Sequence, residues 1–258
     1  MQLITAVLLL PALALANPVA KRQSKAPPAD EIKIISAQSS GNGCPQGSVT
    51  STISPDRTVR TAQSPHLLSD KGEKKSHSHN TQLVTFGFDA FQTYIGPSAK
   101  QADKTKQCQI HLSLQYPGGF QYSVVDATYH GWARLDAGVT GTFVSSYFFS
   151  QAASQTCTTR STISGAQWLN GDVYTKQDLI ESTAVIWSPC GANGILNVNN
   201  RIALSSTNAK QTGELSNDDA TVAFTHQLHV AWQPCVMPTK GSGGEWTIGG
   251  GSTAIVEE

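Results

Sequence analysis

Apolar and polar residues alternate along most of the chain after residue 44, and this period-two pattern predicts β-strands. The clearest examples lie at 110–116, 127–135, 196–204 and 222–232. Shorter candidates lie at 49–54, 83–91, 140–149 and 183–187. No window shows a sustained apolar stripe with a period of 3.6 residues, so we expect little helix.

Turn-forming residues separate these segments, as in Pro117-Gly118-Gly119 and Asn170-Gly171-Asp172. Strands with one apolar and one polar face are typical of antiparallel sheets that bury one side. We therefore predict an all-β fold, an antiparallel β-sandwich of eight or more strands. A β-barrel would show the same alternation and is the alternative.

The chain begins with the features of a secretory leader. An apolar run over residues 3–15 ends at Ala16 in a small-x-small pattern, and it is too short to span a bilayer. The dibasic pair Lys21-Arg22 follows and resembles a processing site. We predict a signal peptide over 1–16, a short propeptide over 17–22, and a secreted, extracellular protein.

The remaining chain divides by composition. Residues 23–42 are expected to form a flexible leader, 43–235 a single β-domain, and 236–258 a glycine-rich flexible tail. The polar segments 64–80 and 206–219 interrupt the strand pattern and are expected to be exposed loops.

Charge excludes some classes of partner. Without residues 1–22 the chain carries 16 Lys and Arg against 18 Asp and Glu, a net charge of about −2. Such a balance offers no electrostatic footprint for nucleic acid or for an anionic membrane surface. The end of the chain lacks the hydrophobic tail of a lipid-anchor signal, so we expect no membrane anchor.

Five cysteines remain after processing, and in an oxidising compartment they predict two disulfides and one free thiol. Their spacing matches no zinc motif. If the chain follows the expected strands, Cys190 and Cys235 lie close together at one end of the sandwich. Cys44 and Cys108 each stand at the start of a strand. We therefore predict the pairs Cys44–Cys108 and Cys190–Cys235, with Cys157 free.

The usual catalytic and cofactor motifs are absent from the sequence. It contains no G-x-S-x-G elbow, no H-E-x-x-H zinc helix and no glycine-rich phosphate loop between a strand and a helix, and we expect no cofactor. Two converging carboxylates could still hydrolyse a glycosidic bond. The candidates are Asp136, Asp172, Asp178 and Glu181, although each also has an ordinary turn or surface role available.

The histidines divide into three groups. His77 and His79 lie in the 64–80 loop and could hold a metal weakly, although a solvated loop is the favoured explanation. His226 falls on an apolar strand face and is expected to be a hydrogen-bonded core or edge histidine. His111 and His130 fall on polar faces and are expected to be solvated.

Tryptophan gives the strongest hint of a binding surface. Trp132 falls on the polar face of its strand beside His130 and Arg134, where it could stack on a sugar or anchor a protein partner. Trp168 could anchor a partner from a loop tip. Burial against a neighbouring strand or loop is the alternative for both.

Several short strings along residues 41–235 stand out in combination. They are Gly43-Cys44-Pro45, Cys108-Gln109-Ile110, Tyr116-Pro117-x-Gly119-Phe120, Ala127-x-Tyr129-x-Gly131, Leu135-Asp136-Ala137-Gly138-Val139, Trp187-Ser188-Pro189-Cys190-Gly191 and Trp232-x-x-Cys235. Together they resemble a known family, the secreted domain of unknown function 4360 of filamentous fungi and some bacteria. The resemblance implies a secreted single β-domain, supports the four paired cysteines and implies no activity. Cys157 and the 64–80 loop depart from the common pattern.

These observations favour a secreted, non-catalytic β-sandwich protein that binds a cell-wall glycan or an extracellular protein. A secreted hydrolase with a noncanonical acidic site is the second hypothesis. Weak metal binding by His77 and His79 is the third.

Overall fold

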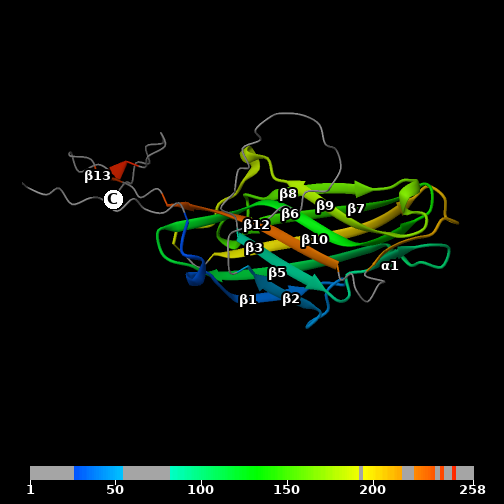
Figure 1. Ribbon diagram of the computed structural model, residues 1–258, viewed down its shortest axis with the longest axis horizontal. Coiled ribbons are helices and arrows are strands. Elements are labelled where there is room, and N and C mark those ends of the chain that lie inside the picture. The colour runs from blue at the N-terminus through cyan, green and yellow to red at the C-terminus, as the bar shows by residue number, and fades with distance from the viewer. Residues whose placement is uncertain are drawn as a thin grey trace, which may run out of the picture.

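The computed structural model describes residues 26–54, 82–191, 194–216, 224–235, 239–240 and 246–247. Its strands form two main antiparallel sheets packed face to face, as Figure 1 shows. The predicted all-β sandwich is therefore confirmed. The one α-helix of the described residues, α1 (Gln101–Lys104), has a single turn.

The first sheet, which we call sheet A, has five strands. In spatial order they are β1 (Lys33–Ser40), β5 (Thr105–Gln115), β10 (Ile195–Ser206), β7 (Val139–Phe149) and β8 (Cys157–Ile163).

The second sheet, sheet B, has seven strands built around the long strand β6 (Phe120–Leu135). On one side β6 pairs with β12 (Phe224–Pro234) and then with β11 (Gly213–Ser216). On the other side it pairs with β9 (Asp172–Leu179). The remaining strands are β2 (Val49–Ile53) and β3 (Gln82–Phe88) beyond β12, and β4 (Thr93–Ile95) beyond β11.

The remaining described elements are short. A separate hairpin pairs β13 (Thr239–Lys240) with β14 (Trp246–Thr247). Four single-turn 3₁₀ helices complete the described elements: η1 (Ala29–Glu31), η2 (Ser150–Ala152), η3 (Ala166–Trp168) and η4 (Ser182–Ala184).

The core lies between the sheets because alternate residues of each central strand point inward. On β7 the burial pattern alternates without a break, and Phe143, Tyr147 and Phe149 are all buried. On β10 the inner row includes Leu196 and Val198. Aromatic rings dominate this layer, where they supply large apolar area and favourable edge contacts.

Two disulfides join segments distant in sequence. Cys44 bonds Cys108 with Cα atoms 5.4 Å apart, and Cys190 bonds Cys235 with Cα atoms 5.6 Å apart. These are the two pairs that the strand order predicts. Cys157 is the free cysteine of the described residues and is buried.

The boundaries differ from the sequence-based expectation in several places. Part of the expected leader forms β1, whose half-buried pattern is that of an edge strand and so lacks a clear apolar alternation. The strand expected over 183–187 does not form; η4 occupies its start instead. Part of the expected 206–219 loop forms β11, and part of the expected tail forms the β13–β14 hairpin. The apolar alternation predicts neither β8 nor β9.

Candidate functional site

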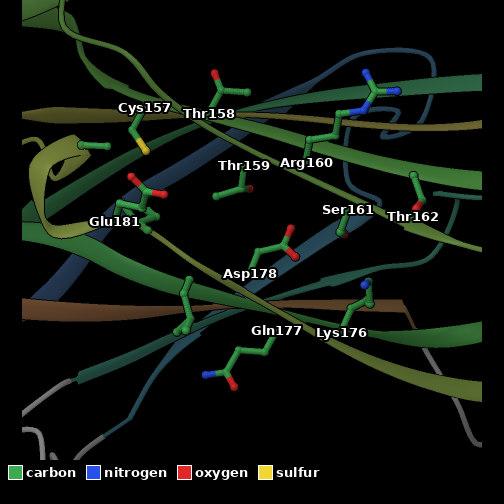
Figure 2. A pocket seen from close by; sticks show the side chains of 13 residues that line it. Cys157, Thr158, Thr159, Arg160, Ser161, Thr162, Lys176, Gln177, Asp178 and Glu181 are labelled. Carbon is green, nitrogen blue, oxygen red and sulfur yellow. The ribbon is translucent and has the colours of Figure 1, made fainter.

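A cleft opens between the two sheets where β8 and β9 form their edges (Figure 2). Among the described residues β8 pairs only with β7, and β9 only with β6. We call this feature the edge cleft. Its walls are residues 157–162 and 176–181 with Ala184, and its volume is about 680 Å³. That volume lies within the usual range of small-ligand sites.

Strand β9 carries its charged side chains on the side that faces the other sheet. Tyr174 is buried in the core, so the period of two places Lys176 and Asp178 on the same inner side. The opposite face carries the apolar side chains Val173 and Leu179, which are 41% and 74% exposed. The amphipathic pattern of β9 is thus inverted relative to that of the central strands.

Strand β8 changes character along its inner row in the same way. Ile163 is buried at one end, and the next inner positions towards the edge cleft are Ser161, Thr159 and Cys157. The inner rows of two strands therefore replace the apolar core with hydroxyl, thiol and charged groups. Figure 2 shows the Asp178 carboxylate directed towards β8.

Three oxygen atoms of this cluster are buried without a hydrogen-bond partner among the described residues. They are Thr159 Oγ1, Ser161 Oγ and Asp178 Oδ2. The two hydroxyls lie close enough to the carboxylate to affect its ionisation, but not in hydrogen-bonding geometry. Buried polar groups normally have partners, and an unpaired one costs about 1–3 kcal/mol. The cluster is thus suited to a ligand that supplies hydrogen-bond donors.

The charge state of Asp178 reflects competing effects. Burial raises the pKa of its carboxyl, while the Ser161 hydroxyl, the Lys176 ammonium group and the Thr159 hydroxyl lower it. Burial dominates, and the net pKa lies above the usual value. A hydrogen-bond donor in the edge cleft would stabilise the ionised form.

Cys157 and Glu181 lie at one end of the edge cleft (Figure 2). Burial raises the pKa of the Cys157 thiol, so it is protonated at neutral pH and weakly nucleophilic. Glu181 is exposed just beyond the end of β9. Of the four acids that sequence considerations favour, only Asp178 and Glu181 line this cleft.

The other two candidate acids have local roles. Asp136 accepts hydrogen bonds from the backbone N–H of Thr212, at 2.7 Å, and from its hydroxyl, at 3.0 Å. Asp172 is exposed at the start of β9 and accepts a bond from the backbone N–H of Val173 at 2.7 Å.

The predicted residues His130, Trp132 and Arg134 follow one another on the outer face of sheet B. The His130 ring bonds the Thr175 hydroxyl on β9, with Nδ1 and Oγ1 2.9 Å apart. The Arg134 guanidinium lies 5.9 Å from the centre of the Trp132 ring, and the backbone of Gly171 also contacts that ring. Trp132 is accordingly half-buried rather than a free stacking platform.

Trp168 lies in η3 and packs partly against the core. Its ring meets that of Tyr174 edge-on, with the centroids 6.3 Å apart. Trp132 and Trp168 are both half-buried, and these positions do not test whether either ring binds a ligand. Their role in binding therefore stays a prediction.

His226 belongs to a second polar cluster, which lies in the centre of the core. The Tyr129 hydroxyl donates to Ser145 Oγ at 2.7 Å, and Ser145 donates to Asn200 Oδ1. Asn200 Nδ2 lies 3.1 Å from His226 Nδ1, and His226 Nε2 lies 3.2 Å from the Tyr147 hydroxyl. All five side chains are buried. The hydrogen bonds link them into one continuous central network, in which each of these polar groups has a partner.

Burial lowers the pKa of His226 to about 3. The ring is therefore neutral, and it stacks on Tyr129 with centroids 4.6 Å apart. The expectation of a hydrogen-bonded core histidine is confirmed.

Two of the remaining histidines pair with neighbouring side chains. His111 bonds Asn197 at 2.6 Å, and His229 lies 3.4 Å from Asp126. His77 and His79 lie outside the described residues. Within the described ranges no group of three or more His, Cys, Asp or Glu side chains could hold a metal ion, and no helix there is long and apolar enough to cross a membrane.

The fold and the bridges define the class of this protein as a disulfide-bonded antiparallel β-sandwich. Residues 70–235 match the family described as a domain of unknown function, DUF4360, and the chain belongs to that family. A relative from Arthroderma benhamiae, described as an uncharacterized secreted protein, is 37% identical over 210 residues. That alignment covers 81% of this chain and 74% of the relative.

Two solved structures of carbohydrate-binding modules align weakly. One is TmCBM61 in complex with β-1,4-galactotriose, with 11% identity, 75% of this chain and 88% of that chain covered, and a TM-score of 0.23. The other represents carbohydrate-binding modules of the β-sandwich superfamily, with 11% identity, 76% and 56% covered, and a TM-score of 0.24. These TM-scores are too low to show a shared fold.

Proposed function

We propose that this chain is a secreted, non-catalytic protein that binds a saccharide in the edge cleft. The observation that carries the proposal is the cluster of Thr159, Ser161 and Asp178. Each lines a cleft of about 680 Å³ and has a buried oxygen atom without a hydrogen-bond partner among the described residues. A saccharide presents many hydroxyl groups, each of which donates one hydrogen bond and accepts others.

Complementary charges would orient such a ligand. Sugar hydroxyls would donate to the Asp178 carboxylate, and the Lys176 ammonium group beside it would donate to a second hydroxyl. Hydrogen bonds to charged groups contribute about 1.5–3 kcal/mol each. The apolar atoms of Ile180 and Ala184 complete the wall and would contact the carbon skeleton.

The test is binding of the mature protein to a panel of neutral cell-wall oligosaccharides, measured by calorimetry. We expect Asp178→Asn to weaken binding by about 10-fold to 100-fold, as the loss of a charged acceptor predicts, and Ser161→Ala to weaken it less. Asp172→Asn is the matched control, because it changes the same group on the same strand outside the edge cleft. We expect it to bind as the wild type does.

Three outcomes would contradict the proposal. One is binding lost in Trp132→Ala but kept in Asp178→Asn, which would place the site on the outer face of sheet B. A second is no binding to any saccharide. The third is that Asp178→Asn only promotes self-association, since inward charges on edge strands also prevent edge-to-edge pairing. Size-exclusion chromatography of the same variants measures that effect.

A hydrolase is the second candidate, because the edge cleft holds both Asp178 and Glu181. The raised pKa of Asp178 suits a general acid, and the other carboxylate would activate water. Incubating the bound oligosaccharide with the protein and analysing the products distinguishes the two. Intact saccharide after long incubation favours a binding protein, and cleavage lost in both Asp178→Asn and Glu181→Gln favours the hydrolase.

A further inference from the structure

The strands of sheet A carry no carboxylate. None of β1, β5, β7, β8 and β10 contains Asp or Glu, whereas sheet B carries Asp126, Asp172, Asp178 and Glu214 on its strands. The two sheets therefore differ in charge as well as in position. An anionic partner would meet no repulsion from the strands of sheet A.

The strand register aligns cationic and amide side chains on the outer face of sheet A. Arg201 on β10 lies opposite Gln107 on one side and Val144 on the other, and Val144 lies opposite Arg160 on β8. Both arginines are exposed. They are two strands apart, which places their Cα atoms about 10 Å from one another.

A groove follows this part of the face, and we call it the sheet A groove. It has a volume of about 410 Å³. The neighbouring register row adds Gln109, Asn199 and Ser146 to its lining. Its described lining contains one charged side chain, Arg201, and no acid.

One buried atom in the groove indicates the chemistry of a ligand. Asn199 Oδ1 is buried without a hydrogen-bond partner among the described residues, so it requires a donor. Arg201, by contrast, supplies donors and pairs best with a carboxylate. A ligand that carries both hydroxyl and carboxylate groups satisfies both requirements, whereas an inorganic anion satisfies only Arg201.

We infer that the sheet A groove binds a carboxylate-bearing polysaccharide, a chain of uronic acid residues. A sugar carboxylate pairs with Arg201, and sugar hydroxyls bond Asn199, Gln107 and Gln109. Arg201 and Arg160, which lines the edge cleft and not the sheet A groove, are too few for nucleic acid, where affinity rests on many neutralised phosphates. They are also fewer than the four to eight basic residues typical of acidic lipid recognition. The site is separate from the edge cleft and does not depend on the function proposed for it.

The experiment measures affinity of the mature protein for polygalacturonate at low and high salt. We expect Arg201→Gln to weaken binding about tenfold, as loss of one charge-assisted hydrogen bond predicts, and Asn199→Ala to weaken it by a smaller factor. Lys210→Gln is the control, because Lys210 is exposed in the loop after β10 and its substitution removes the same charge. It should bind as the wild type does. Circular dichroism verifies that each variant is folded.

Two further measurements test whether the ligand charge and the sheet A groove carry the binding. Methyl-esterified polygalacturonate lacks the charge and should bind much more weakly; equal binding would overturn the inference. Asp178→Asn should leave polygalacturonate binding unchanged, whatever it does to neutral saccharides. Loss of polygalacturonate binding in Asp178→Asn, or an equal loss in Arg201→Gln and Lys210→Gln, would also overturn it.

Discussion

Two clusters of polar side chains lie between the sheets of this sandwich, one in the centre and one at the edge. In the central network, Tyr129, Ser145, Asn200, His226 and Tyr147 bond one another in sequence. In the edge cleft, one oxygen atom each of Thr159, Ser161 and Asp178 is buried without a hydrogen-bond partner among the described residues. A satisfied network strengthens and specifies a core, whereas unpaired groups weaken it. The central network therefore stabilises the fold, whereas the unpaired groups of the edge cleft are those on which the proposed binding rests.

The largest expected effect comes from a substitution in the hydrophobic core beside the central network. Phe143 is fully buried on β7, and its ring packs against those of Tyr129 and Tyr174. We expect Phe143→Ala to lower the free energy of unfolding by about 3–5 kcal/mol. Leu179→Ala on the exposed face of β9 should change it by less than about 0.5 kcal/mol. Urea unfolding of both variants checks this, and similar losses would contradict the placement of the core.

A smaller effect concerns pH and the central network. The pKa of His226 is lowered by burial to about 3, against about 6.5 in the unfolded chain. Below pH 6.5 the unfolded state therefore binds a proton that the folded state does not, and stability falls as pH falls. From pH 6.5 to pH 4 the loss from this group is about 3 kcal/mol. Its neighbours Tyr129 and Tyr147 have raised pKa values and stay neutral in this range.

Nuclear magnetic resonance measures this directly. The His226 ring signals of the folded protein should not titrate between pH 7 and pH 4, whereas a free histidine in water titrates near pH 6.5. Titration of the His226 signals near pH 6.5 would show that the ring is solvated. It would contradict the placement of His226 in a buried, hydrogen-bonded central network.

The smallest effects come from a pair of hydroxyl deletions. Ser145→Ala removes a hydroxyl that bonds both Tyr129 and Asn200, and we expect a loss of about 2 kcal/mol in unfolding free energy. Thr159→Val removes a buried hydroxyl without a partner among the described residues while keeping its shape. It should leave stability unchanged or raise it by up to about 1 kcal/mol. Equal destabilisation by the two, measured by urea unfolding, would mean that the edge hydroxyl is bonded.

The same contrast explains what could be predicted from the sequence. The central strands show apolar alternation because their inner rows fill the core, and the strand order then brings Cys190 to Cys235. The edge strands β8 and β9 do not show it, since Thr159, Ser161, Lys176 and Asp178 occupy inner positions. The sequence of β9 does alternate, but its apolar residues Val173 and Leu179 lie on the outer face of sheet B and not on the core face. Assigning that phase requires knowing that Tyr174 points inward, which is a tertiary fact.

The candidate site residues also differ in how far the sequence predicts their placement. Register along one strand places His130, Trp132 and Arg134 together, so their shared face follows from the sequence. The edge cleft joins two strands of different sheets, and no local pattern indicates that Asp178 faces Ser161. The contact of Gly171 with the Trp132 ring likewise arises from a loop that returns over the sheet.

The Cys44–Cys108 bridge has a consequence for the integrity of the molecule. Its two cysteines are 64 residues apart, and Cys44 lies between β1 of sheet A and β2 of sheet B. The bridge closes a covalent ring that contains β2, β3, β4 and α1. A single peptide-bond cut between residues 45 and 107 therefore linearises the ring without dividing the molecule. A protease in the surrounding medium would have to cut elsewhere, or a reductant would have to act first, before the first sheet A strand could separate from the rest.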